Sequence, residues 1–272
     1  MRKYRSMLLC VLASAVAAAV CGAGELRLSR EDIRRVGDRI FENECASRDE
    51  FLLQWNVGEE FLSLGIAHFI WYPAGRRGPF EESFPGFMAF ARAAGAKPPA
   101  WLAAEPFPSC PWKTRKEFLA KADSRRANEL RQFMRSTKQL QAAFVVRRLE
   151  DALPSLLAAA PEEERETVER RFRAVASTPA GVYALIDYAN FKGLGTHPSE
   201  RYKGKGWGLL QVLSQMGGAG GGESSLKEFA ETAKRLLAER VDNAPRARNE
   251  RRWLPGWQRR VDSYQAFGRQ NV

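Results

Sequence analysis

The sequence is poor in the residues that build metal centres and nucleophilic triads. Among 272 residues there are two histidines and four cysteines. With so few ligands and no Cys or His pairs at zinc spacing, we expect no metal site. A Ser-His-Asp hydrolase is also disfavoured, because the Gly-x-Ser-x-Gly elbow is absent and only His68 and His197 are available. Nothing in the sequence indicates another cofactor.

Long apolar runs are absent after the first residues, and none approaches the roughly 20 apolar residues that a membrane span needs. At the N-terminus, Arg2, Lys3 and Arg5 precede an apolar stretch at 7–20 and small residues at 21–23. This pattern predicts an export signal over residues 1–23. Lipidation at Cys21 is a less favoured alternative, because Val20 stands where a small residue is required. We therefore expect residues 24–272 to form one soluble domain in the periplasm or outside the cell, with no stable membrane insertion.

The charge is strongly positive, with 43 Lys and Arg against 32 Asp and Glu, a formal net charge of +11. Such a surface attracts a polyanion. Nucleic acid is not the expected partner, because no zinc spacing, basic zipper or aromatic RNA-binding motif accompanies the charge. The Gly- and Lys-containing segment 199–208 lacks the spacing of a phosphate loop. For an exported chain the acidic polymer available as a partner is the cell wall. The alternative is an ordinary basic surface exposed to solvent, with no polyanionic partner.

Two cysteines, Cys45 and Cys110, remain after removal of the signal. Disulfides form in oxidising compartments outside the cytoplasm. The candidate disulfide is therefore Cys45 to Cys110, and two free buried thiols are the alternative.

The segment after the signal predicts a helix. In "SREDIRRVGDRIFENECAS", Ser29 is placed as an N-cap and Asp32 as the third helical residue, a capping-box arrangement. Ile33, Val36 and Ile40 recur at helical spacing. We expect this helix to run to about Glu44.

The next segment, "FLLQWNVGEEFLSLGIAHFIWYPAGRRGPF", predicts a short hairpin or small sheet, because aromatic and β-branched residues are closed by a turn signal. The rest of the chain is typical of helices, with a Gly-rich loop at 217–223. One long helix is expected to stop before Pro154, since a residue preceding proline avoids the helical conformation. The fold class is therefore α+β and predominantly helical. The expected helices are 85–94, 114–122, 124–153, 162–176, 180–191, 208–216, 225–241 and 249–267.

Glu44 is the candidate catalytic residue. At about 100° per residue it falls in the apolar stripe of its helix, which would direct a carboxyl group at the core. Desolvation raises the pKa of such a group, and a protonated carboxylic acid is what cleavage of a glycosidic bond requires. The alternative is that the helix frays and the side chain reaches solvent. Glu59 or Glu60 is the candidate second carboxylate.

These residues resemble phage-type lysozymes and endolysins, glycoside hydrolases that carry a glutamate at the end of their first helix. A short sheet follows in that family, with a second acid and the pattern Thr-x-Gly-x-Gly-His. Here Glu44 matches the acid, Ser63 stands in place of the threonine, and "SLGIAH" supplies Gly65, Ala67 and His68. The resemblance implies a lysozyme-like fold with a small N-terminal sheet and a helical main lobe. It also implies that Ser63 and an acid hold water, and that His68 anchors the sheet beside the cleft; a hydrogen-bonded core histidine is the alternative.

Two further motifs extend the resemblance. "YALIDYANFKG" is similar to an endolysin helix, which implies that Asn190 approaches the cleft. "GWGLLQVL" is similar to the Gly-Leu-Met-Gln element of lytic transglycosylases and goose-type lysozymes, which implies that Gln211 borders the sugar groove. Tyr202 and Trp207 are candidate sugar platforms, with packing in the core as the alternative. "ERRWLPGWQRRVDSY" resembles the Arg- and Trp-rich terminal helices of the phage enzymes.

The expected function is exported cleavage of peptidoglycan glycan strands by a muramidase-like glycosidase. Three departures from the family pattern leave alternatives open: Ser63 replaces threonine, Ala67 replaces the last glycine, and the second acid is a glutamate closer to Ser63. One alternative is a catalytically inactive lysozyme-like protein that binds the wall or a periplasmic partner. The other is a lytic transglycosylase, which uses the same acid without a water.

Overall fold

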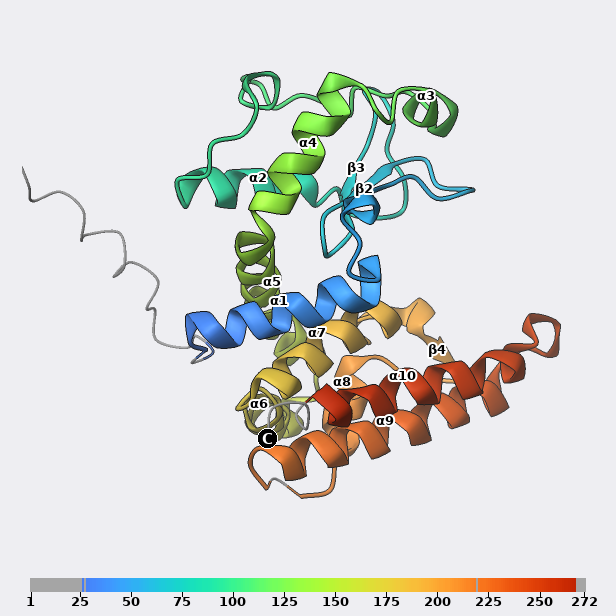
Figure 1. The fold of residues 1–272 in the computed structure, drawn as a ribbon. Coiled ribbons are helices and arrows are strands. Elements are labelled where there is room, and N and C mark those ends of the chain that lie inside the picture. The colour runs from blue at the N-terminus through green and yellow to red at the C-terminus, as the bar shows by residue number, and fades with distance from the viewer. Residues whose placement is uncertain (1–25, 27, 219, 268–272) are drawn as a thin grey trace, which may run out of the picture.

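The computed structural model describes residue 26 and residues 28–218 and 220–267. The expected signal at 1–23 lies outside these residues. Figure 1 shows two lobes. A sheet lobe, residues 49–136, carries β1–β3 and α2–α4, and a helical lobe, residues 162–267, carries α6–α10. Helices α1 and α5 lie between the two lobes.

The helices and strands have the following bounds. The helices are α1 (Arg30–Cys45), α2 (Phe84–Ala93), α3 (Arg115–Ala120), α4 (Arg125–Ser136), α5 (Lys138–Ala159), α6 (Arg165–Val175), α7 (Pro179–Lys192), α8 (Leu209–Gln215), α9 (Glu223–Asn243) and α10 (Leu254–Phe267). The strands are β1 (Leu53–Gln54), β2 (Leu62–Leu64), β3 (Phe69–Trp71), β4 (Arg201–Tyr202) and β5 (Lys205–Gly206). The α+β, predominantly helical class is confirmed.

Helix α1 forms as its sequence predicts. The Ser29 hydroxyl accepts from the Asp32 amide, and the Asp32 carboxylate accepts from the Ser29 amide. Its apolar stripe buries Val36 and Ile40. A Cβ on Gly37 would overlap the Cβ of Ala142, so the missing side chain lets α1 approach α5 closely. The helix ends at Cys45, and Glu44 therefore lies in its last turn.

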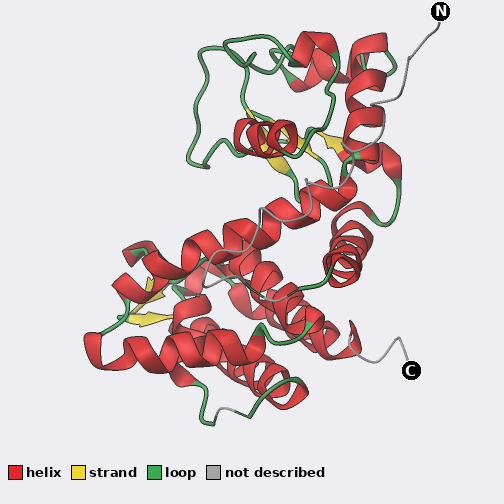
Figure 2. Ribbon diagram, turned by 90° about the vertical axis from the view of Figure 1, so that its left-hand side faces the viewer, coloured by secondary structure: helices red, strands yellow, loops and turns green. Residues whose placement is uncertain are grey.

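The predicted small sheet is confirmed as an antiparallel meander in the order β1-β2-β3. Ser63 in the central strand pairs with Gln54 on one side and with Ile70 on the other. The β2–β3 turn passes through Gly65, with φ of 72°, and His68, with φ of 51°. A second hairpin, β4–β5, lies in the other lobe (Figure 2).

The long helix expected at 124–153 is two helices, which corrects the prediction. The chain breaks at Thr137, whose hydroxyl donates to the Phe133 carbonyl over 2.7 Å. The buried Gln141 side chain donates to the Met134 carbonyl over 2.5 Å and accepts from the Ile66 amide over 2.9 Å. One side chain therefore satisfies a carbonyl freed by the break and joins the break to the sheet.

The expected stop before Pro154 is also wrong, because α5 continues through this proline to Ala159. A proline inside a helix removes one backbone hydrogen bond and costs about 3 kcal/mol. Leu153 and Leu156 on either side of it are buried in the core. Their burial offsets that cost at roughly 1.5–3 kcal/mol for each side chain.

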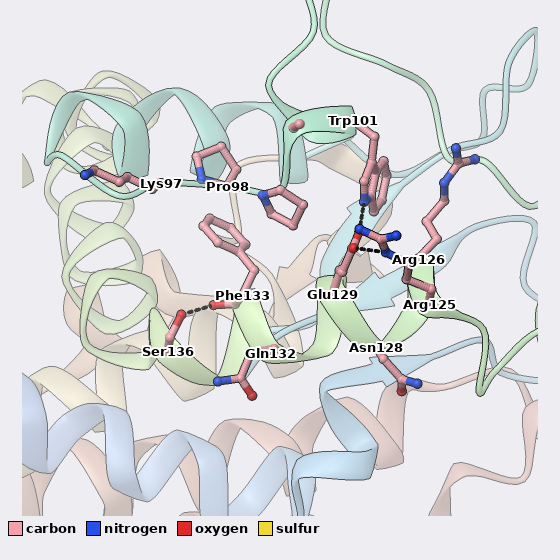
Figure 3. A pocket seen from close by; sticks show the side chains of 12 residues that line it. Lys97, Pro98, Trp101, Arg125, Arg126, Asn128, Glu129, Gln132, Phe133 and Ser136 are labelled. Carbon is pink, nitrogen blue, oxygen red and sulfur yellow. Dashed lines mark hydrogen bonds and ion pairs between the residues drawn. The ribbon is translucent and has the colours of Figure 1, made fainter.

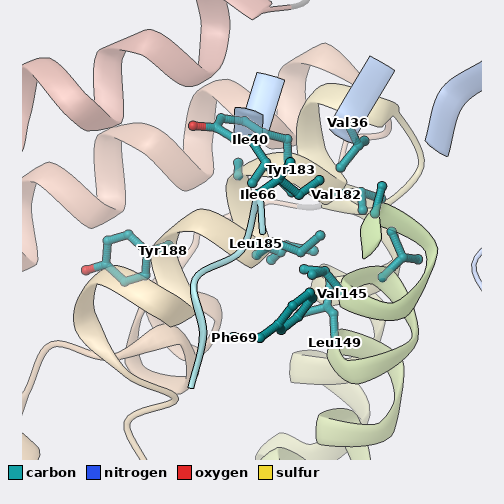
Figure 4. Packing of buried hydrophobic residues seen from close by; sticks show 14 of the residues in the cluster. Val36, Ile40, Ile66, Phe69, Val145, Leu149, Val182, Tyr183, Leu185 and Tyr188 are labelled. Carbon is teal, nitrogen blue, oxygen red and sulfur yellow. The ribbon is translucent and has the colours of Figure 1, made fainter. Parts of the chain in front are cut away.

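The core runs continuously from the sheet into the helical lobe. Figure 4 shows Phe69 of β3 beside Val145 and Leu149 of α5, with Val182 and Leu185 of α7 next to them. Helix α7 is buried on nearly all sides. An acid within such a helix, here Asp187, needs partners inside the protein. These partners are part of the site described below.

The candidate disulfide is not formed, since Cys45 and Cys110 are both free and buried. The Cys45 thiol donates to the carbonyls of Phe51 and Gly65, at 3.7 and 3.8 Å. Cys110 joins the sheet region through its amide, which donates to the Tyr72 carbonyl. Burial raises the pKa of both thiols to about 12, so they remain protonated and unreactive near neutral pH.

Candidate active site

The Glu44 side chain lines a pocket of about 350 Å³ between the end of α1, the β2–β3 turn, α7 and α10. The pocket brings together three of the predicted site residues, Glu44, His68 and Asn190. Apolar side chains from α1, α5 and α7 form much of its wall. The lining residues are Ile40, Asn43, Glu44, Ala67, His68, Val145, Tyr183, Ile186, Asp187, Asn190, Phe191 and Arg260.

The Glu44 carboxylate is held by two groups that are distant in sequence. Its Oε1 accepts from Arg260 Nη2 at 2.9 Å, across 216 positions of the chain. Its Oε2 lies 3.7 Å from His68 Nδ1. The side chain is 31% exposed. It is therefore neither isolated among apolar groups nor frayed into solvent, which were the two alternatives that the sequence left open.

Asp187 anchors the arginine from the other side. Its carboxylate accepts from Arg260 Nε at 2.9 Å and from Arg260 Nη2 at 2.7 Å. It also accepts from the hydroxyls of Tyr264, at 2.5 Å, and Tyr183, at 3.3 Å. The Asp187 side chain is 4% exposed. With four donors and almost no exposure, Asp187 fixes the guanidinium and has no capacity left for a ligand.

The charges of this network reinforce its geometry. Burial alone would lower the pKa of Arg260, but the hydrogen bonds and charge of Asp187, together with Glu44, raise it above its ordinary value. Burial and the neighbouring Asp187 charge raise the pKa of Tyr183 and of Tyr264. Both phenols therefore stay protonated and donate to the aspartate. Arg260 is thus a permanent cation in a fixed position.

One guanidinium serves two carboxylates, so the three groups carry a net charge of −1 when both acids are ionised. Asp187 takes two of the guanidinium hydrogen bonds and Glu44 takes one. Glu44 is therefore the less fully paired of the two carboxylates that line this pocket.

His68 and Asn190 complete the polar wall. His68 is held in the left-handed conformation of the β2–β3 turn, which brings its ring against Glu44. Its Nε2 is buried and has no hydrogen-bond partner among the described residues. The sequence predicted an anchor of the sheet beside the cleft; the structure places the ring between the turn and the carboxylate. Asn190 comes from α7, one turn after Asp187.

The other predicted acids lie elsewhere, which corrects that part of the site. Glu59 accepts from Asn56 in an exposed turn, and Glu60 is paired with Arg76. Ser63 is buried in β2 and, like the two acids, does not line the pocket. The reason is the direction of the hairpin. Glu60 precedes β2 whereas His68 follows it, so the two residues lie at opposite ends of this strand.

Tyr202, Trp207 and Gln211 do not line this pocket either. The Trp207 ring is buried 4.5 Å from that of Tyr202, which corresponds to the core alternative. The Tyr202 hydroxyl donates to Glu250 over 2.8 Å. Gln211 accepts from the Gly208 amide and donates to the Gly195 carbonyl, so it caps α8 and holds the preceding loop.

Sequence reasoning missed Asp187, Arg260 and Tyr183, although all three lie in motifs that it quoted. A usable signal was the acid itself, because "VYALIDYANF" places Asp187 inside a nearly continuous apolar run. A buried charge of this kind requires a partner. The identity of that partner could not be read from spacing.

A larger pocket of about 900 Å³ lies in the sheet lobe, between segment 97–101 and α4 (Figure 3). Its acid, Glu129, accepts from Trp101 Nε1 at 3.0 Å and from Arg125 Nε at 2.7 Å. Arg126 lies over the Trp101 ring. This pocket contains none of the predicted site residues, and its one carboxylate, Glu129, is already engaged by Arg125 and Trp101. The Glu44 pocket is therefore the stronger candidate for an active site.

In the part of the chain that the structure describes, no group of three or more His, Cys, Asp and Glu side chains is placed to hold a metal ion. Nor does any described helix have the length and hydropathy to cross a membrane. Comparisons with family models, curated proteins and solved structures give no significant match. The functional argument therefore depends on the site.

Proposed function

We propose that this chain cleaves glycan strands of the peptidoglycan class, with Glu44 as the general acid. The observation that carries the proposal is a half-buried carboxyl in a pocket, held by an arginine whose charge is mostly directed to a second, buried acid. The polar side chains of His68 and Asn190 beside an apolar wall suit a sugar, which presents hydroxyl and amide groups around an apolar ring face.

The shape of the site supports a polymeric substrate. A second pocket of about 170 Å³ shares four lining residues with the Glu44 pocket: Ala67, Val145, Ile186 and Asn190. The two spaces therefore adjoin along α5 and α7. Two adjoining spaces, with an acid in one of them, fit a chain of sugars better than a single small molecule.

The count of available acids favours one form of the reaction. Asp187 is saturated, and Glu59 and Glu60 lie outside the pocket. Glu44 would protonate the glycosidic oxygen as the bond to C1 breaks. A hydroxyl of the same sugar would then bond to C1 and return its proton to Glu44, without consuming water. This is the transglycosylase form; hydrolysis would need water to attack C1 with its proton taken up by Glu44 alone.

A non-catalytic glycan-binding protein is the second candidate. The observation that favours it is the 2.9 Å contact of Arg260 with Glu44, which occupies one carboxylate oxygen that a general acid would use. The same pocket would then bind a sugar without cleaving it.

Purified protein and its Glu44→Gln variant, assayed on isolated peptidoglycan with mass analysis of the products, separate these possibilities. The proposal expects cleavage by the natural chain and loss of cleavage in the variant, with products lighter by one water than those of hydrolysis. Binding without cleavage by either protein supports the second candidate. Equal cleavage by both proteins contradicts the role of Glu44.

A further inference from the structure

The segment that joins α9 to α10, residues 244–253, carries a dense group of exposed cations. It contains four arginines, all of them exposed: Arg246, Arg248, Arg251 and Arg252. We call these arginines, together with the exposed Trp253, the basic tip. Figure 1 shows this segment projecting beyond β4 at one end of the helical lobe. We propose that the basic tip binds the surface of an anionic lipid bilayer. The inference is independent of the Glu44 pocket, which no residue of the tip lines.

The one acid of this segment, Glu250, is turned inward and anchors the tip. Its side chain is 8% exposed, and its carboxylate accepts two hydrogen bonds from Arg240 and one from Tyr202. This carboxylate therefore fixes the two short turns Arg246–Arg248 and Glu250–Trp253 to the helical lobe. Because the acid faces inward, the outward side of the segment carries arginines without an exposed carboxylate of its own.

Most of the charge of the basic tip is open to a partner. Arg246 and Arg252 form no ion pair with any residue that the structure describes. Arg251 is 81% exposed and lies 3.3 Å from Asp242, which is itself 69% exposed. Exposed pairs of this kind are weak, so an anionic surface can replace Asp242 as the partner of Arg251. Several guanidinium groups are thus available at once to phosphate groups, which arginine recognises well.

Trp253 favours a bilayer over a soluble polyanion. It is 52% exposed, and Arg252 lies over its ring at 4.8 Å from the centroid. Tryptophan is enriched where a membrane meets water, with its ring at the level of the headgroups, and basic residues beside it are attracted by anionic lipids. The shape agrees, because a projecting tip can meet a flat surface. No residue of the tip lines a pocket described above, whereas a polymer chain is usually held in a groove.

Sedimentation with lipid vesicles tests the inference on residues 24–272, which include every described residue and lack the apolar stretch at 7–20. That stretch would itself bind lipid. Vesicles of phosphatidylcholine alone are compared with vesicles that contain equal parts of phosphatidylcholine and phosphatidylglycerol. The natural chain is expected to bind only the anionic vesicles, and to bind them more weakly as salt is raised.

Two variants of the basic tip should weaken binding to the anionic vesicles. Arg251→Gln combined with Arg252→Gln should weaken it by about five-fold for each charge removed. Trp253→Ala should weaken it by about ten-fold, because the ring no longer enters the headgroup region.

The chain offers a matched control for each variant. Arg125→Gln combined with Arg126→Gln removes two adjacent exposed arginines elsewhere, one of which also lies over a tryptophan ring. Leu119→Ala removes a large apolar side chain of similar exposure, 49%. Both controls are expected to stay within about two-fold of the natural chain, because a bilayer attracts only charges within about a Debye length of its surface. Thermal unfolding of each variant confirms that it is folded.

Four results would overturn the inference. The first is failure of the natural chain to bind the anionic vesicles, and the second is equal binding to both kinds of vesicle. The third is an equal loss in the Arg125 and Arg126 control, since net charge rather than the tip would then drive binding. The fourth is a single-stranded DNA oligonucleotide whose binding falls as much with Trp253→Ala as vesicle binding does, because the tip would then recognise a polyanion rather than a bilayer.

Discussion

Two of the arginine–glutamate pairs that involve the helical lobe differ in what surrounds them. Arg240 meets Glu250 through two hydrogen bonds of 2.7 and 2.9 Å, and their side chains are 15% and 8% exposed. Arg260 meets Glu44 through one hydrogen bond of 2.9 Å, with side chains 34% and 31% exposed. The same residue types thus form one closed pair and one open pair.

The closed pair is surrounded by aromatic side chains. Arg240 lies over the rings of Trp207 and Trp257, at 4.0 and 5.0 Å from their centroids. Glu250 also accepts from Tyr202, and the hydrogen bond from Arg240 is the largest cause that lowers the pKa of Glu250. Space beside the carboxylate, rather than the ion pair itself, is therefore what makes Glu44 the candidate functional residue.

The largest expected effect is on activity. Glu44→Gln should reduce glycan cleavage by roughly 10²–10⁴-fold, because an amide cannot donate a proton in place of the acid. Turnover on isolated peptidoglycan measures this, with Glu59→Gln and Glu60→Gln as controls that retain activity since both side chains lie outside the pocket. A comparable loss of turnover in either control would show that the role assigned to Glu44 is wrong.

The next largest effect is on stability. Asp187→Asn should lower the free energy of unfolding by about 3 kcal/mol, because removal of the buried carboxylate leaves the partly buried arginine incompletely compensated. Urea unfolding followed by circular dichroism measures the change. Tyr183→Phe is the matched control, since it removes one weak donor to the same carboxylate and should cost less than about 1 kcal/mol. Equal costs for the two variants would contradict the anchoring role of Asp187.

A smaller effect is expected at the closed pair. Glu250→Gln should lower the free energy of unfolding by about 2 kcal/mol while turnover per folded molecule stays unchanged, because Gln keeps the shape but loses a buried charge. Measuring stability and turnover on the same preparations tests the contrast between the pairs. Loss of turnover at unchanged stability would remove the distinction between them.

The smallest effect is a pH dependence beside the closed pair. Lys192 is buried, with its Nζ 3.2 Å from the centroid of the Trp257 ring. Burial, assisted by the charge of Arg240, lowers the pKa of Lys192 from 10.5 to about 6. Between these values the unfolded chain binds a proton that the folded chain does not, so the free energy of unfolding rises with pH across this window.

Lys192→Met removes this dependence. The variant should be more stable than the natural chain near pH 7, and the difference should shrink as pH rises toward 10.5, by about 1.4 kcal/mol per pH unit. Urea unfolding at a series of pH values measures the two slopes. If the variant is less stable at every pH, contact of a charged amine with the Trp257 ring outweighs the effect of burial.

Local patterns predicted the parts of the fold that depend on neighbours in the chain. The Ser29–Asp32 capping box and the stripe of Val36 and Ile40 define α1, and the aromatic and β-branched run closed by a turn signal predicted the small sheet. The break at Thr137 and the passage of α5 through Pro154 were missed. In both cases buried side chains, Gln141 and the leucines near Pro154, override the local preference.

The candidate site divides in the same way. The motifs pointed to His68 and Asn190, and both residues line the same pocket as Glu44. They failed for Glu59 and Glu60, which were chosen by distance along the chain. The candidate disulfide is likewise not formed, since Cys45 and Cys110 are both free and buried.

The sequence by itself determined the helix-rich α+β class, the first helix with its terminal carboxyl, and the small sheet, because these follow from periodicity, capping and turn chemistry within a few residues. Only the tertiary structure decided that Arg260 reaches Glu44 and that Asp187 holds this arginine. Ion pairs between residues so far apart depend on how α1, α7 and α10 pack, and packing of the whole core is not contained in any short pattern.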